Sequence, residues 1–92
     1  MIISFRSKPL KLYYEKGDVS KLPADQLTRI QNILTRLDIA TKPEQLNVPG
    51  YDYHQLKGNL SGFYSVKVKN NFKIIFQFAD ENVLDVDYLD YH

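Results

Sequence analysis

The fold is decided by one stretch of the chain, Phe63-Tyr64-Ser65-Val66-Lys67-Val68-Lys69-Asn70-Asn71-Phe72-Lys73-Ile74-Ile75-Phe76-Gln77-Phe78. Apolar and polar side chains alternate along both halves of it, and two asparagines interrupt the alternation in the middle. A period of two is typical of strands with one buried face, and a two-residue break is of hairpin length. We therefore predict antiparallel strands over residues 63–68 and 72–78. Their apolar face is expected to carry Val66, Val68, Phe72, Ile74, Phe76 and Phe78, and their polar face Ser65, Lys67, Lys69, Lys73 and Gln77.

The same pattern continues on both sides of this hairpin. Residues 51–56 and 83–89 are predicted to form further strands, separated from it by turns over 58–62 and 80–82. Turns of this length join neighbouring strands into an antiparallel meander. Near the start of the chain, residues 2–5 form one more short apolar strand candidate.

The first half of the chain carries helical signals instead. Ser7 is a suitable N-cap, Pro9 is tolerated in a first turn, and Gly17 is a suitable helix end. A second helix is predicted over residues 23–40, where apolar side chains recur at three- and four-residue steps: Leu27, Ile30, Ile33, Leu34 and Leu37. The order β-α-α-β-β-β-β indicates a two-layer α+β fold, with a mainly antiparallel sheet packed on two helices. Residues 1–92 leave room for a single domain.

The composition excludes several classes of chemistry. The chain has no cysteine, so disulfides, thiolate catalysis and cysteine-ligated zinc are ruled out. The two histidines, His54 and His92, are not spaced for a metal site, and we expect neither a metal nor another cofactor. No stretch approaches the roughly 20 apolar residues of a membrane span, and the first residues lack the pattern of a signal peptide. We therefore expect a cytoplasmic protein without membrane contact.

Charge is distributed unevenly although the net charge is only +1. Residues 53–79 contain four lysines and no acidic residue, whereas residues 80–92 contain five acidic residues and neither lysine nor arginine. A window with lysine as its only charged residue is suited to contact with a phosphate backbone. The alternative is a solvated sheet face whose lysines prevent aggregation through the strand edges.

The strongest proton-transfer side chains lie in one predicted strand, at His54, and at Asp90-Tyr91-His92. Histidine has an ordinary pKa of about 6.5, so it can take and give a proton near neutrality. Two histidines, a carboxylate, a phenol and lysines are the side chains that a metal-free ribonuclease uses. Plainer interpretations stand beside this one: His54 as a polar strand residue, His92 as a frayed last residue, and Asp90 as part of a solvated acidic segment.

Several motifs occur in an order that resembles a known family. They are Ile3-Ser4-Phe5, Pro49-Gly50, His54-x-Leu56-Lys57-Gly58, Gly62-x-x-Ser65-Val66-x-Val68, Asn71-Phe72-Lys73-Ile74-x-Phe76 and Asp90-Tyr91-His92. Together they resemble the HigB toxins, which belong to the RelE/ParE superfamily of bacterial type II toxin–antitoxin systems. The resemblance spans the whole chain and implies a RelE-like fold.

The resemblance also implies an activity and partners. HigB toxins are ribosome-dependent mRNA endonucleases that cut the message in the ribosomal A site, and a cognate helix-turn-helix antitoxin (HigA-like) keeps them silent. The functional positions that the resemblance implies here are His54, Asp90, Tyr91 and His92, with Lys57 and Lys73 as supporting basic residues. Lys67 and Lys69 are expected to contact the RNA backbone. The chain departs from the family where Lys73 replaces the usual arginine, and where Tyr64 and Phe72 replace tryptophans.

Cleavage of RNA without a metal requires a base for the 2′-hydroxyl proton, an acid for the departing 5′-oxygen, and positive charge beside the phosphoryl oxygens. His54 and His92 can supply the acid–base pair in either order, and Asp90 can orient a ring or raise its pKa. Lys57 and Lys73 can stabilise the phosphorane. Tyr91 can stack on a base or hydrogen-bond to a phosphate.

Two other functions remain open at this point. ParE-like members of the superfamily keep the fold, cut no RNA and poison DNA gyrase, and they have no need of a histidine pair. A protein-binding module that has lost its activity is the third interpretation, with Lys73 in place of arginine as its one indication.

Overall fold

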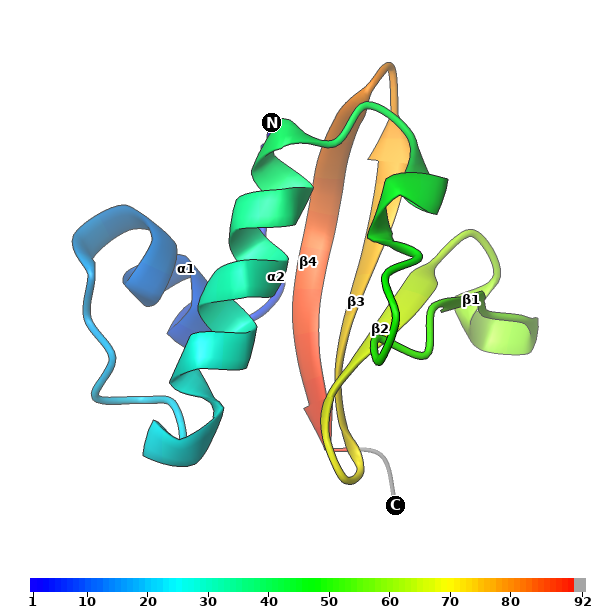
Figure 1. The fold of residues 1–92 in the computed structure, drawn as a ribbon. Helices are drawn as coiled ribbons and strands as arrows, with labels where there is room; N and C mark the ends of the chain where they lie inside the picture. The colour runs from blue at the N-terminus through cyan, green and yellow to red at the C-terminus, as the bar shows by residue number, and fades with distance from the viewer. Residues whose placement is uncertain (91–92) are drawn as a thin grey trace.

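A four-stranded antiparallel sheet is the frame of the molecule, seen in a computed structural model that describes residues 1–90 (Figure 1). The strands lie in chain order across the sheet. Their bounds are β1 (His54–Gln55), β2 (Tyr64–Lys69), β3 (Phe72–Ala79) and β4 (Asn82–Asp90). The α1 and α2 helices lie to one side of the sheet (Figure 1). The predicted two-layer α+β fold with a mainly antiparallel sheet is therefore confirmed.

Both helices begin and end close to the predicted positions. The Ser7 hydroxyl accepts a hydrogen bond from the Leu10 amide at 3.2 Å and caps α1 (Lys8–Lys16). Gly17 follows with a left-handed φ of 69°, a conformation that glycine adopts without steric cost. A short 3₁₀ turn, η1 (Ala24–Gln26), precedes α2 (Leu27–Ile39). None of the helices within residues 1–90 is long and apolar enough to cross a bilayer.

The core lies between α2 and the helix side of the sheet. Apolar side chains from both layers are excluded from water there, and each contributes roughly 1.5–3 kcal/mol of burial free energy. Those with no measurable exposure are Leu10, Ile30, Ile33, Leu37, Leu46, Val66, Ile74, Phe76, Val83 and Val86.

The predicted strand over residues 2–5 forms two isolated bridges instead of a regular strand. Ile2 and Phe5 pair in parallel with Val83 and Val86 of β4. The register is interrupted because β4 contains a bulge at Asp85, which has a φ of 55° and whose amide donates to the Ser4 hydroxyl at 2.9 Å. The first residues therefore extend the sheet beyond β4 in an irregular way.

The strand predicted over residues 51–56 is also shorter than expected. Only His54 and Gln55 pair with β2, as β1. Asp52 has a φ of 48°, which turns the chain, and Tyr51 is buried in the core. A 3₁₀ turn, η2 (Pro43–Leu46), follows α2, and past β1 the chain enters another, η3 (Gly58–Leu60).

The sheet face turned away from the helices, here called the outer face, is less polar than predicted. Ser65 and Ile75 lie opposite each other on it, and both are buried. Leu56 and Leu60 from the β1–η3 segment line a small hollow above them. The face predicted to be polar is therefore partly apolar, because a segment without regular strand structure covers part of it.

Candidate functional site

The strand register places the candidate residues in rows on the outer face. Directly paired residues share a face of a sheet, and residues two apart along a strand share it too. One row runs from His54 through Ser65 and Ile75 to Asp87. The next row contains Lys67, Lys73 and Leu89. The outer face therefore carries His54, Lys67 and Lys73 on one surface.

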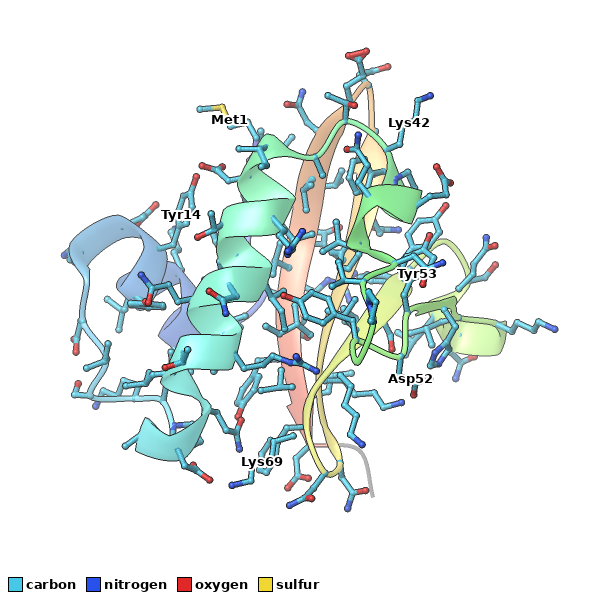
Figure 2. The ribbon with its side chains drawn as sticks, in the orientation of Figure 1. Met1, Tyr14, Lys42, Asp52, Tyr53 and Lys69 are labelled. Atoms are coloured by element: carbon cyan, nitrogen blue, oxygen red, sulfur yellow. The ribbon has the colours of Figure 1, made fainter. Side chains whose placement is uncertain are left out.

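His54 is exposed, and its ring is oriented by the backbone of the preceding turn. Its Nδ1 lies 2.9 Å from the carbonyl oxygen of Asp52. Asp52 lies in the turn just before β1, the edge strand of the sheet (Figure 2). A carbonyl oxygen only accepts, so this contact places a proton on Nδ1. In the neutral ring, Nε2 is then the nitrogen that carries no proton.

Arg29 of α2 fixes the loop that leads to His54. Its guanidinium donates to the carbonyl oxygens of Gly50 at 2.5 Å and Lys67 at 3.2 Å. It also lies 4.5 Å from the ring centroid of buried Tyr51, in cation–π contact. The Tyr51 carbonyl oxygen in turn accepts from the Lys67 amide at 2.6 Å. Arg29 therefore joins the helix, the loop and β2 at one point.

This role of Arg29 was not anticipated from the sequence. An arginine on the polar side of an amphipathic helix is ordinarily solvated, so its position on the helical wheel carried no signal. The one sequence signal near this contact was Gly50, because glycine often marks a sharp turn of the backbone. In the structure Gly50 has a φ of 88° and its carbonyl oxygen accepts from Arg29.

Lys67 and Lys73 are direct cross-strand partners on β2 and β3. Lys67 is exposed and Lys73 is half-buried. By the spacing of strands and residues in a sheet, the Cα atoms of His54 and Lys73 are roughly 12 Å apart, so side chains from both positions can reach one phosphodiester from opposite sides. Lys57, also exposed, immediately precedes η3 and the positive φ of Gly58.

Lys69 lies on the other side of the sheet from Lys67, contrary to the prediction. A register shift between them inserts one extra residue into β2, which reverses the alternation. Lys69 then pairs with Phe72, and its Nζ lies 2.6 Å from Oδ2 of Asp25 in η1. This ion pair lowers the pKa of Asp25. Figure 2 shows Lys69 at the hairpin end of the sheet.

Asp90 shares this location with Lys69. The register pairs Asp90 with Phe72, which places it on the helix side and not beside His54. Phe72 stacks on Tyr88, with centroids 5.5 Å apart, and the Tyr88 hydroxyl donates to Gln26. Burial first, and then the charges of nearby carboxylates, raise the pKa of Tyr88 to about 12.

The remaining two predicted site residues, Tyr91 and His92, lie outside the described residues. Within residues 1–90, no three histidine, aspartate or glutamate side chains gather in a way that could hold a metal ion. A groove of about 300 Å³ between α1 and α2 is lined by residues of both helices and is separate from the outer face. Tyr14 lines this groove (Figure 2), and its hydroxyl donates to Oδ1 of Asp38 at 2.6 Å.

Comparison with known proteins identifies the family of the chain. The family model of the HigB-like toxins, described as the RelE-like toxin of type II toxin–antitoxin system HigB, matches residues 3–92. Endoribonuclease HigB of Proteus vulgaris is 42% identical over 92 residues, with both chains covered completely. Toxin HigB-1 of Vibrio cholerae serotype O1 is 34% identical over 97 residues, covering all of this chain and 98% of its own.

Solved structures show the same fold at lower sequence identity. A YoeB–YefM complex from Staphylococcus aureus matches with a TM-score of 0.64 and 18% identity, covering 100% of this chain and 95% of the other. The YoeB dimer from the same organism has a TM-score of 0.60 and 17% identity over 99% of this chain and 94% of the other.

The sheet and its two helices are those of a RelE-like fold, as in the toxins of bacterial toxin–antitoxin pairs. Within that class, the chain belongs to the HigB-like toxins of type II toxin–antitoxin systems.

Proposed function

We propose that this protein is an endoribonuclease toxin that cleaves mRNA in the ribosomal A site, without a metal ion. The observation that carries the proposal is His54, held on the outer face with Nδ1 against the Asp52 carbonyl, which leaves Nε2 as the ring nitrogen proposed for proton transfer. Lys67 and Lys73 supply positive charge on the same face. The activity named for the Proteus vulgaris relative supports the assignment.

The proposed reaction is attack of the 2′-hydroxyl on the adjacent phosphate. One histidine of the pair His54 and His92 removes the 2′ proton, and the other protonates the 5′-oxygen as the P–O bond breaks. The products are a 2′,3′-cyclic phosphate and a 5′-hydroxyl. Nε2 is the working atom of His54, because Nδ1 is engaged by the backbone.

The basic residues are proposed to act on the phosphoryl oxygens, where negative charge grows during attack. Lys73 stabilises the phosphorane and Lys57 assists it from the β1–η3 segment. Lys67 binds the RNA backbone. Lys69 is the least suited to this role, because it lies on the helix side and pairs with Asp25.

The roles proposed for Asp90, Tyr91 and the antitoxin rest on the resemblance to the family. Asp90 is proposed to orient an imidazole in the complete site, and Tyr91 to contact a base or a phosphate. The regulatory partner is proposed to be a helix-turn-helix antitoxin of the HigA kind. Solved relatives of the fold include a heterotetrameric toxin–antitoxin assembly, YoeB–YefM, which supports a protein partner of this class.

The test is primer extension on cellular mRNA after induced expression of the protein without a partner. The wild type is expected to produce discrete cuts within translated regions, and His54→Ala is expected to abolish them. Gln55→Ala is the matched control, since Gln55 is the exposed neighbour of His54 on β1. Intact transcripts together with accumulated gyrase–DNA cleavage complexes would instead assign the protein to the gyrase-poisoning branch.

A further inference from the structure

Ser65 has a buried hydroxyl group that finds no hydrogen-bond partner among residues 1–90. The residue is 1% exposed, and its Oγ makes no hydrogen bond within this part of the chain. Buried polar groups are nearly always paired, because an unpaired one loses its hydration without compensation. Ser65 lies directly opposite His54 on the outer face, so the unpaired group is next to the proposed site.

Ser65 is one of the residues that line a small hollow with aliphatic walls. The space measures about 10 Å³, which accommodates a single water-sized group. Apart from Ser65 it is lined by Leu56, Leu60, Lys73, Ile75 and Leu89. Ile75 is buried, and the other four lining residues are half-buried. The partly exposed Leu56, Leu60 and Leu89 around the opening are here called the leucine shelf.

The chemistry of these walls selects the kind of group that fits. A phosphate would lose its hydration against aliphatic carbons with one hydroxyl in return, which is unfavourable. A nucleobase combines a flat apolar face with small polar atoms at its edge. The face can lie on the leucine shelf while one edge atom enters the hollow, and a hydroxyl can both donate to and accept from that atom.

We propose that the Ser65 hollow is a recognition site for the edge of one RNA base, next to the scissile phosphate. One exocyclic group of the base enters the hollow and hydrogen-bonds with Ser65 Oγ, while the ring packs on Leu56, Leu60 and Leu89. Lys73 at the rim joins this contact to the phosphate that it is proposed to stabilise. The inference rests on the proposed endoribonuclease function and adds the determinant of its base preference.

The test is single-turnover cleavage on ribosomes programmed with short messages that differ by one base at each position around the cut. For Ser65→Ala we expect kcat/KM on the preferred message to fall about tenfold, the loss of one hydrogen bond, and to approach that of the disfavoured messages. Ser65→Thr keeps the hydroxyl but fills the hollow with a methyl group, and should lower cleavage of the preferred message by excluding the base edge. Ser61→Ala, an exposed serine in the adjacent turn, is the matched control and should change neither value.

Thermal melting separates this role from a structural one. Removal of an unpaired buried hydroxyl should leave the melting temperature of Ser65→Ala unchanged or raise it. A preference pattern identical to wild type in both Ser65 variants would overturn the base-edge site while leaving the nuclease proposal intact. Absence of cleavage by the wild type on every message would overturn the nuclease proposal, and this inference with it.

Discussion

Lys67 and Lys73 lie directly opposite each other on β2 and β3, so two positively charged residues are neighbours on the outer face. Like charges in direct cross-strand pairs are destabilising, by roughly 0.2–1 kcal/mol. An anion bound beside the pair would reduce this repulsion. In the proposed function the two lysines are expected to differ in what they do for the bound RNA.

Lys73→Ala is expected to lower the single-turnover cleavage rate by about a hundredfold or more, with little change in ribosome binding. A charge that acts in the transition state alone affects the rate, whereas one that acts equally in the ground state affects affinity. Lys67→Ala is the matched variant and should mainly weaken binding. Lys73→Arg should retain or improve activity, because a guanidinium contacts two phosphoryl oxygens at once. An unchanged rate for Lys73→Ala would mean that Lys57 or Tyr91, and not Lys73, stabilises the charge on the phosphoryl oxygens.

Lys67→Thr is expected to stabilise the free protein at low ionic strength, by up to about 1 kcal/mol. Threonine suits a strand position, and its introduction removes one of the two opposed charges. The gain should shrink in high salt, because ions screen exposed charges. Urea denaturation of the wild type and Lys67→Thr at a low and a high salt concentration measures the gain in each condition. A gain that is the same at both concentrations would mean that strand propensity, not repulsion, causes it.

Arg29→Ala is expected to destabilise the protein by about 1–3 kcal/mol, since two backbone carbonyls and a buried ring lose a charged partner. Hydrogen exchange should show the strongest loss of protection at residues 50–53, next to His54. Arg36→Ala is the matched control, because Arg36 lies 5.9 Å from the same ring. Equal loss of protection in the two variants would contradict a special role for Arg29.

Tyr14→Phe is expected to destabilise the protein by about 1 kcal/mol at neutral pH and to flatten its stability at both pH extremes. The Asp38 contact raises the pKa of Tyr14 to about 12, so this contribution is complete below pH 10 and is lost as the pH rises toward 12. The same bond lowers the pKa of Asp38 below its ordinary value near 4. That contribution is present above pH 4 and is lost as the pH falls through the lowered value.

Urea denaturation at pH 3, 7 and 11 tests this prediction, with Tyr13→Phe as the neighbouring control. The acid effect should be partial, because the Ile2 amide also donates to Asp38, at 3.1 Å. A stability difference between the wild type and Tyr14→Phe that stays constant from pH 10 to 12 would contradict the hydrogen bond to Asp38 as its cause, because Tyr88 titrates in the same range in both proteins.

The parts of the fold that local chemistry determines were predictable from the sequence. Ser7 and Gly17 mark the ends of α1 because a side-chain cap and a left-handed glycine act over a few residues. The β2–β3 hairpin follows from alternation around Asn70-Asn71 in the same way. The side of the sheet on which Lys69 lies was not predictable, because one inserted residue reverses every side chain that follows.

Tertiary contacts determine the rest of the site. From the sequence, Ser65 is expected to be a polar residue on the surface. It is buried because the β1–η3 segment covers it. From the sequence, Arg29 is expected to be a solvated helix residue. In the structure its hydrogen-bond partners are backbone carbonyl oxygens from distant parts of the chain. Neither position has a sequence pattern that reports on such contacts. The orientation of the His54 ring depends likewise on a backbone turn at Asp52.

The pairing of residues 2–6 with β4 gives the molecule an unusual assembly order. Successive hairpins connect β2, β3 and β4, and they close over short loops. Ile2 can meet Val83 only after nearly the whole described chain has been looped back, which is the slowest kind of contact to form. The meander and α2 are therefore expected to assemble first, and residues 2–6 to dock last. Refolding of this small domain is then limited by topology more than by the strength of its core.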